Sequence, residues 1–175
     1  MTDSFERLYQ AYGKVVTFFA VLAGMVTFAT MWLIDANVLM RKFFNTPVQG
    51  SFELTEAGLV LIVFLSLAYT QYKRGHIRVT LLTRHLPIAV QHRLYIIVLF
   101  VGALFFAWCS YAAYTNAIRS YGMNEQEWGV IQLPIWPLKS AIVLGTALIS
   151  VQYLLDAIRH CFVTRGLLPP AGEEP

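Results

Sequence analysis

The charged residues best placed for chemistry lie where long apolar runs of this sequence end and begin. Arg41 follows the first apolar run, Glu53 and Glu56 open the second, and Lys139 opens the last. Ionisable groups near lipid are costly and are usually paired. We therefore expect electrostatic chemistry: Arg41 and Lys139 form ion pairs with Glu53 and Glu56, or these four residues contact a partner. The alternative is that each side chain reaches the lipid headgroups and stays solvated.

Residues for covalent, metal or cofactor chemistry are not grouped in this sequence. A haem held between membrane helices needs axial ligands at depth, and none of the four histidines lies inside an apolar run. Cys109 and Cys161 are far apart and form neither a C-x-x-C motif nor a Cys/His cluster. Neither a nucleophile–base pair nor a phosphate-binding glycine loop is visible. The sequence thus predicts no enzyme activity, no cofactor and no metal site. The histidines are His76, His85, His92 and His160.

Four apolar runs form the elements that must position the charged residues. The chain is 57% hydrophobic and 13% charged, with a mean hydropathy of +0.57, whereas soluble domains carry about 25% charged residues. Each run approaches the ~20 residues that a spanning helix needs. We expect an all-α integral membrane protein with one membrane domain over residues 15–157, preceded by a segment 1–14 and followed by a tail 158–175. The predicted transmembrane helices cover about 15–36, 53–72, 94–118 and 136–156.

The stretch from about residue 77 to 90, between the second and third spans, is too polar to cross a membrane. Its apolar residues recur at helical spacing with basic residues between them, which predicts an amphipathic surface helix. A short connector helix folded against the protein is the alternative. The residues that define the predicted helix are Ile77, Arg78, Leu81, Leu82 and Leu86.

The basic residues indicate orientation rather than nucleic-acid binding. The formal net charge is +3, but the Lys and Arg residues lie between the apolar runs, as membrane orientation requires. Nine of them fall in the N-terminal segment, the middle connection and the tail, and four fall near the other two connections. The excess of positive charge predicts that both termini are cytoplasmic.

Several short motifs carry a resemblance to a known family. They are the hairpin Gly50-Ser51-Phe52-Glu53-Leu54-Thr55-Glu56, the helix end Ala68-Tyr69-Thr70-Gln71, the segment Gly75-His76-Ile77-Arg78-Val79, and the Leu133-Pro134-x-Trp136-Pro137 entry to the last span. With these motifs the chain resembles the small Q-type (DctQ-like) membrane subunit of tripartite ATP-independent periplasmic (TRAP) transporters. One departure is Thr80, which stands where the family often has an aspartate. Threonine can still cap a helix, but it lacks the carboxylate for a charge-dependent contact.

The resemblance implies a role in the bacterial inner membrane. Such a subunit works beside a large permease subunit, which takes up a solute, commonly an organic acid, together with sodium, while a periplasmic solute-binding protein delivers that solute. The small subunit is implied to be a scaffold in contact with the large subunit and with membrane lipids. Two other functions stay open from the residues: a self-sufficient small homo-oligomeric transporter or channel, and the membrane anchor subunit of a redox enzyme.

Overall fold

The structure of the chain is a computed structural model that describes residues 2–73 and 88–164. Its elements are the helices α1 (Thr2–Phe44), α2 (Ser51–Tyr72), α4 (Ile88–Met123) and α5 (Trp136–Thr164). All four are long and apolar enough to cross a membrane. The prediction of an all-α protein with four spanning helices is therefore confirmed. The residues that define the predicted surface helix, from Ile77 to Leu86, lie outside the described residues.

The helices are longer than the predicted spans because polar segments at their ends continue the same helical path. α1 includes residues 2–14, and its helix ends only at Phe44, past the apolar run. α4 and α5 likewise extend beyond residues 94–118 and 136–156. A 43-residue helix is roughly 64 Å long at 1.5 Å per residue, about twice the thickness of the bilayer core. Parts of these helices must therefore leave the hydrocarbon layer or tilt strongly.

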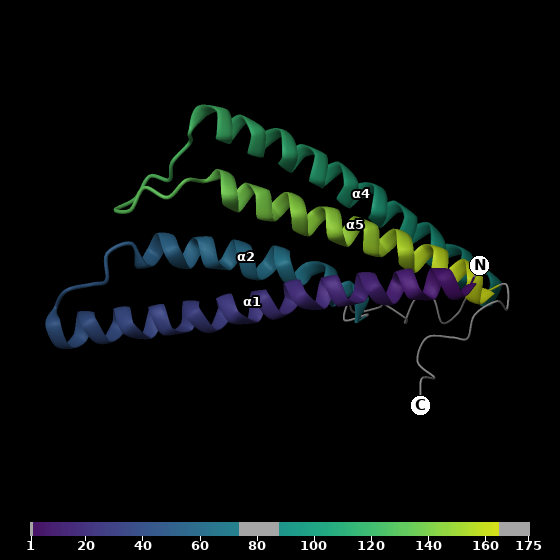
Figure 1. Ribbon diagram of the computed structural model, residues 1–175, viewed down its shortest axis with the longest axis horizontal. Coiled ribbons are helices and arrows are strands. Elements are labelled where there is room, and N and C mark those ends of the chain that lie inside the picture. The colour runs from purple at the N-terminus through teal and green to yellow at the C-terminus, as the bar shows by residue number, and fades with distance from the viewer. Residues whose placement is uncertain (1, 74–87, 165–175) are drawn as a thin grey trace.

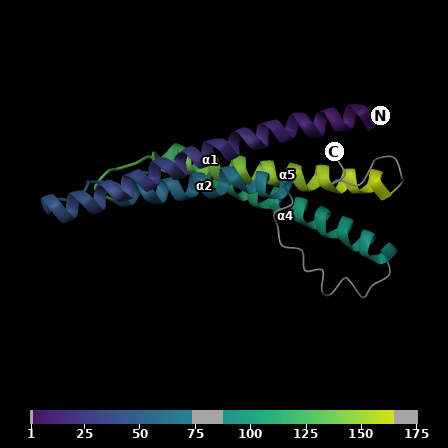
Figure 2. The same cartoon turned by 90° about the horizontal axis from the view of Figure 1, so that it is seen from below.

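The helices lie side by side in the order α1, α2, α5, α4, and each packs against its neighbour in that order (Figure 1). The connections 45–50 and 124–135 lie together at one end, which we call the loop end. The N-terminus, the start of α4 and the end of α5 lie at the other, the terminal end, and the shorter α2 stops before reaching it. Figure 2 shows that α1 and α4 diverge toward the terminal end, with α5 between them.

Only a small buried core joins the helices. Val16 of α1, Ala68 of α2 and Ile149 of α5 are buried together. Most large apolar side chains face outward instead; Trp108, for example, is 68% exposed. Outward-facing apolar side chains suit a lipid environment, where association depends on close packing rather than on burial from water.

The turn between α1 and α2 is fixed by its sequence. Gly50 has a φ of 74°, in the left-handed region that glycine adopts without steric cost. The Val48 N–H donates to the Asn37 side chain at 2.9 Å, which ties the turn back to α1. This turn places Glu53, in the first turn of α2, beside the 124–135 loop.

Candidate functional site

Glu53 fastens the 124–135 loop to the start of α2. Its side chain is buried, and Oε1 accepts a hydrogen bond from the Val130 N–H at 2.6 Å. The contact is tight, since a Cβ atom on Gly129 would lie only 2.3 Å from the same oxygen. Glu53 is therefore an internal ligand of the loop backbone and not a free surface charge.

Lys139 forms its ion pair with a residue of the same loop. Its ammonium group donates to Glu125 Oε2 at 2.8 Å and also to the Ser120 hydroxyl, which in turn donates to Glu125. The hydrogen bonds from Lys139 and Ser120 lower the pKa of Glu125. The carboxylate thus stays ionised at neutral pH, and the pair is lost only as the pH falls through this lowered pKa.

Glu127 lies near two other carboxylates. Burial and the charges of Glu56 and Glu53 raise its pKa, and a side-chain hydrogen bond with Glu56 adds to the effect. One of its carboxylate oxygens is buried without a hydrogen-bond partner in the structure. Like charges at such spacing disfavour the ionised form. Glu127 therefore contributes repulsion at neutral pH.

The structure does not join the four predicted residues into one network. Lys139 pairs with Glu125 instead of Glu53 or Glu56. Within the described part of the chain, Arg41 takes part in neither of the two ion pairs, and Arg41 and Glu56 are both exposed. Whether these four residues contact a partner stays a prediction.

The role of Glu53 gives a first testable prediction. Glu53→Ala removes a hydrogen bond to a charged group, a change that costs about 1.5–3 kcal/mol. We expect faster hydrogen exchange of the Val130 amide and earlier protease cleavage of the 124–135 loop. Asp35→Ala is the control, because Asp35 is an exposed carboxylate of α1, and it should not accelerate exchange. Equal protection of Val130 in wild type and Glu53→Ala would refute the assignment.

The raised pKa of Glu127 gives a second prediction. A group whose pKa is raised on folding stabilises the fold below its ordinary pKa and loses that contribution as the pH rises through the raised value. Glu127→Gln should therefore raise the free energy of unfolding at pH 7.5 by about 0.2–1 kcal/mol, and with it the thermal midpoint. Both should be nearly unchanged at pH 4. Thermal unfolding in detergent at both pH values checks this. Lower stability of the variant at pH 7.5 would contradict it.

A second polar cluster lies at the terminal end and joins three helices. The Asp156 carboxylate of α5 accepts hydrogen bonds from the Tyr9 hydroxyl at 3.0 Å, from the Gln71 amide at 2.9 Å and from the Gln152 amide at 2.9 Å. All four side chains are buried. We call these residues the Asp156 cluster. A buried carboxylate needs such donors, so this cluster fixes α1, α2 and α5 relative to one another.

Further contacts hold α1 against α5 around this cluster. The Tyr12 hydroxyl donates to the Leu148 carbonyl. The Arg159 guanidinium lies 4.7 Å from the Tyr9 ring centre and pairs with Glu6 at 3.4 Å. α1 therefore reaches α5 largely through polar and aromatic side chains.

The predicted last span, 136–156, ends at Asp156, but the cluster was not predicted from the sequence. A signal was present: Gln152 and Asp156 are one helical turn apart at the end of an apolar run, and Gln71 ends the run of α2. Two histidines also meet at this end, with His92 Nδ1 3.1 Å from His160 Nε2. Among the described residues, no group of three or more His, Cys, Asp or Glu side chains is placed to hold a metal ion.

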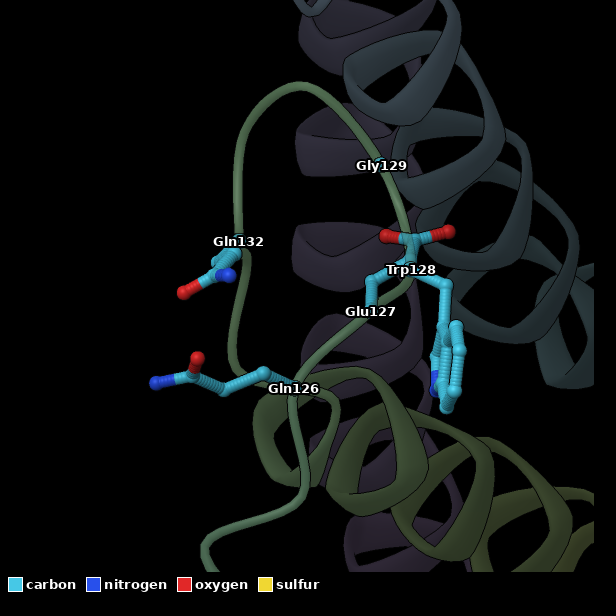
Figure 3. A pocket seen from close by; sticks show the side chains of 5 residues that line it. All are labelled: Gln126, Glu127, Trp128, Gly129 and Gln132. Carbon is cyan, nitrogen blue, oxygen red and sulfur yellow. The ribbon is translucent and has the colours of Figure 1, made fainter.

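An open hollow of about 610 Å³ lies on the 124–135 loop. Figure 3 shows that its side chains do not converge: Gln126 and Gln132 project from one side of the loop, and the Trp128 indole projects from the other. A small-molecule site needs convergent polar groups in a concave pocket. The geometry of this hollow therefore favours a surface contact over ligand capture.

Comparison with known proteins gives one family match. The family model described as "Tripartite ATP-independent periplasmic transporters, DctQ component" matches residues 30–162. This range includes α2, α4, nearly all of α5 and both loops of the loop end. No curated protein matches the chain at a significant level. The resemblance found in the hairpin and helix-end motifs is confirmed.

Proposed function

Because the chain belongs to the DctQ component family of the tripartite ATP-independent periplasmic transporters, we propose that it is a scaffold subunit that braces a large permease subunit. It is a multi-pass membrane protein and a transporter component. Its proposed partners are the large permease, a periplasmic solute-binding protein and the surrounding lipids of a bacterial inner membrane.

The observation that carries this proposal is where the buried polar groups lie. Glu53 and Ser120 form hydrogen bonds at the loop end, and the Asp156 cluster joins helices near the terminal end. Between them, the buried Thr146 bonds the carbonyl of Ile142 in its own helix. Transporter sites use broken helices and polar groups near the bilayer midplane, and the four described helices are continuous through that region. Groups that hold helices together support a bracing role.

We further propose that the assembly takes up an organic acid or a similar solute together with sodium. In this account both termini are cytoplasmic, which the distribution of Lys and Arg supports. The shared position of the N-terminus and the end of α5 agrees with this orientation (Figure 1). The predicted surface helix with Ile77, Arg78, Leu81, Leu82 and Leu86 would then lie on the cytoplasmic leaflet.

The predicted charged residues divide into two groups under this proposal. Glu53 and Lys139 hold the 124–135 loop from within the chain. Arg41 and Glu56 are exposed at the loop end and are the residues that we propose for contact with the large subunit. Exposed charges at the rim of an interface set its orientation more than its strength.

Co-purification tests the proposed partnership. The chain, tagged at its C-terminus, is produced together with a large permease subunit of a tripartite ATP-independent periplasmic transporter and extracted in mild detergent. We expect both proteins to elute together at a fixed ratio, and we expect Arg41→Glu to reduce the recovered permease more than the neighbouring Lys42→Glu does. Elution of the chain as a homo-oligomer without the permease would instead favour a self-sufficient transporter or channel.

A further inference from the structure

The two charged side chains of the 124–135 loop interact with other side chains of the protein, whereas its largest apolar side chain is exposed. Glu125 is held by Lys139 and Ser120, and Glu127 lies partly buried near Glu53 and Glu56. Trp128, by contrast, is 101% exposed, and Val130 is 72% exposed. A loop that faces water usually exposes charged side chains and not large apolar ones. The exposed Trp128 and Val130 therefore suit an environment less polar than water.

Several backbone N–H groups of the same loop are hydrogen-bonded within the protein. The Glu127 N–H donates to Leu133, the Ile135 N–H donates to Glu125, and the Val130 N–H donates to the Glu53 carboxylate, at 2.9, 3.1 and 2.6 Å. In a lipid environment every backbone polar group needs such a partner, because no water replaces it. The loop meets this condition at Glu127 and Val130, on either side of Trp128.

An aromatic pair and an apolar groove lie near the loop end of α4 and α5. Tyr121 at the end of α4 and Trp136 at the start of α5 contact each other edge to face, with ring centres 5.6 Å apart. They border a largely apolar groove of about 310 Å³ between α4 and α5, wide enough for a stretch of acyl chain. Tyr and Trp gather where a membrane meets water, with the ring among the headgroups.

From these observations we propose that the 124–135 loop inserts Trp128 into the lipid headgroup layer at the loop end. Glu53 and the Glu125–Lys139 pair hold the loop in the shape that presents the indole. The occupant is lipid rather than a protein, because the exposed, uncharged Trp128 lies at the same end of the spanning helices as the aromatic pair Tyr121 and Trp136, and aromatic residues at the ends of spans meet the headgroups. This anchor does not depend on the proposed transport function.

Tryptophan fluorescence tests the insertion directly. In the first variant, W32F, W108F and W136F leave Trp128 as the sole tryptophan. The full chain is reconstituted into phosphatidylcholine vesicles that carry bromine near the headgroup or near the chain ends, and acrylamide serves as the aqueous quencher. We expect a blue-shifted emission that headgroup-proximal bromine quenches several-fold more strongly than acrylamide does.

A matched control uses the other side of the same loop. The additional changes W128F and Q132W move the sole tryptophan to position 132, which projects away from Trp128 (Figure 3), and acrylamide should dominate its quenching. Circular dichroism verifies that both variants keep their helix content. Strong quenching of Trp128 by acrylamide with no effect of brominated lipid would overturn the proposal.

A protein occupant is tested by adding the large permease. The single-Trp128 chain is labelled with 5-hydroxytryptophan, which can be excited apart from the tryptophans of the permease, and the complex is reconstituted into the same brominated vesicles. Continued quenching by lipid supports the anchor. Loss of lipid quenching on assembly would show that the permease covers Trp128 and would overturn the proposal, while leaving the proposed function intact.

Discussion

Replacing Gly145 by alanine is expected to force α2 and α5 apart. A Cβ atom at this position would lie 2.2 Å from the Phe64 carbonyl oxygen of α2, a backbone atom that cannot rotate away. Membrane helices approach closely where small residues meet, and overpacking such a contact costs about 1–3 kcal/mol. We expect a lower thermal midpoint in detergent and a lower yield of monodisperse protein. Valine should lower both further.

Gly24→Ala is the control for this substitution. Gly24 also lies inside a helix, but no atom comes within 4 Å of a Cβ built there. Alanine should be neutral or should stabilise α1, by up to about 1 kcal/mol, because it forms helix better than glycine does. Equal midpoints for Gly145→Ala and wild type would show that α2 and α5 are not in backbone contact.

Removing the Asp156 carboxylate is expected to have an effect at least as large. Asp156→Ala leaves the buried donors of Tyr9, Gln71 and Gln152 without their acceptor. A hydrogen bond to a charged group is worth about 1.5–3 kcal/mol in soluble proteins but averages only ~0.6 kcal/mol between membrane helices. For three bonds we expect a loss of about 2–4 kcal/mol, with the first turns of α1 detaching from α5.

Thermal unfolding and cross-linking together measure this loss. A cysteine pair at Phe5 of α1 and Phe162 of α5, whose ring centres lie 5.4 Å apart, should cross-link readily in a background free of other cysteines that retains Asp156 and slowly with Asp156→Ala. Asp35→Ala is the matched control, because Asp35 is an exposed carboxylate of α1. It should change the free energy of unfolding by less than about 0.5 kcal/mol. Unchanged cross-linking in Asp156→Ala would mean that the cluster does not hold α1.

The number and approximate positions of the spanning helices were predictable because they depend on local composition. Runs without charge over about twenty residues have few alternatives to a spanning helix. The helix ends were less predictable: residues 2–14 are polar, yet they continue α1. There Tyr9 and Tyr12 find partners on α5, more than 130 residues away in sequence, and composition gives no indication of such contacts.

The sequence indicates which charged residues stand at the ends of the spans, but not which of them meet. Residue depth follows from position along a span, and Glu53 and Lys139 each stand at the start of a span that begins at the loop end. Which charges meet depends on the path of the 124–135 loop, and this loop brings Glu125 back to Lys139. The hydrogen bond from Val130 to Glu53 depends on the same path. No pattern in a single sequence predicts the path of this loop.

Reconstituted uptake tests the central claim, that this chain braces a permease and does not transport by itself. Vesicles would hold the chain alone, the large permease alone or both together, with the binding protein, labelled organic acids and a sodium gradient supplied outside. We predict uptake only when both membrane subunits are present. Sodium-driven uptake by vesicles that contain this chain alone would contradict the account.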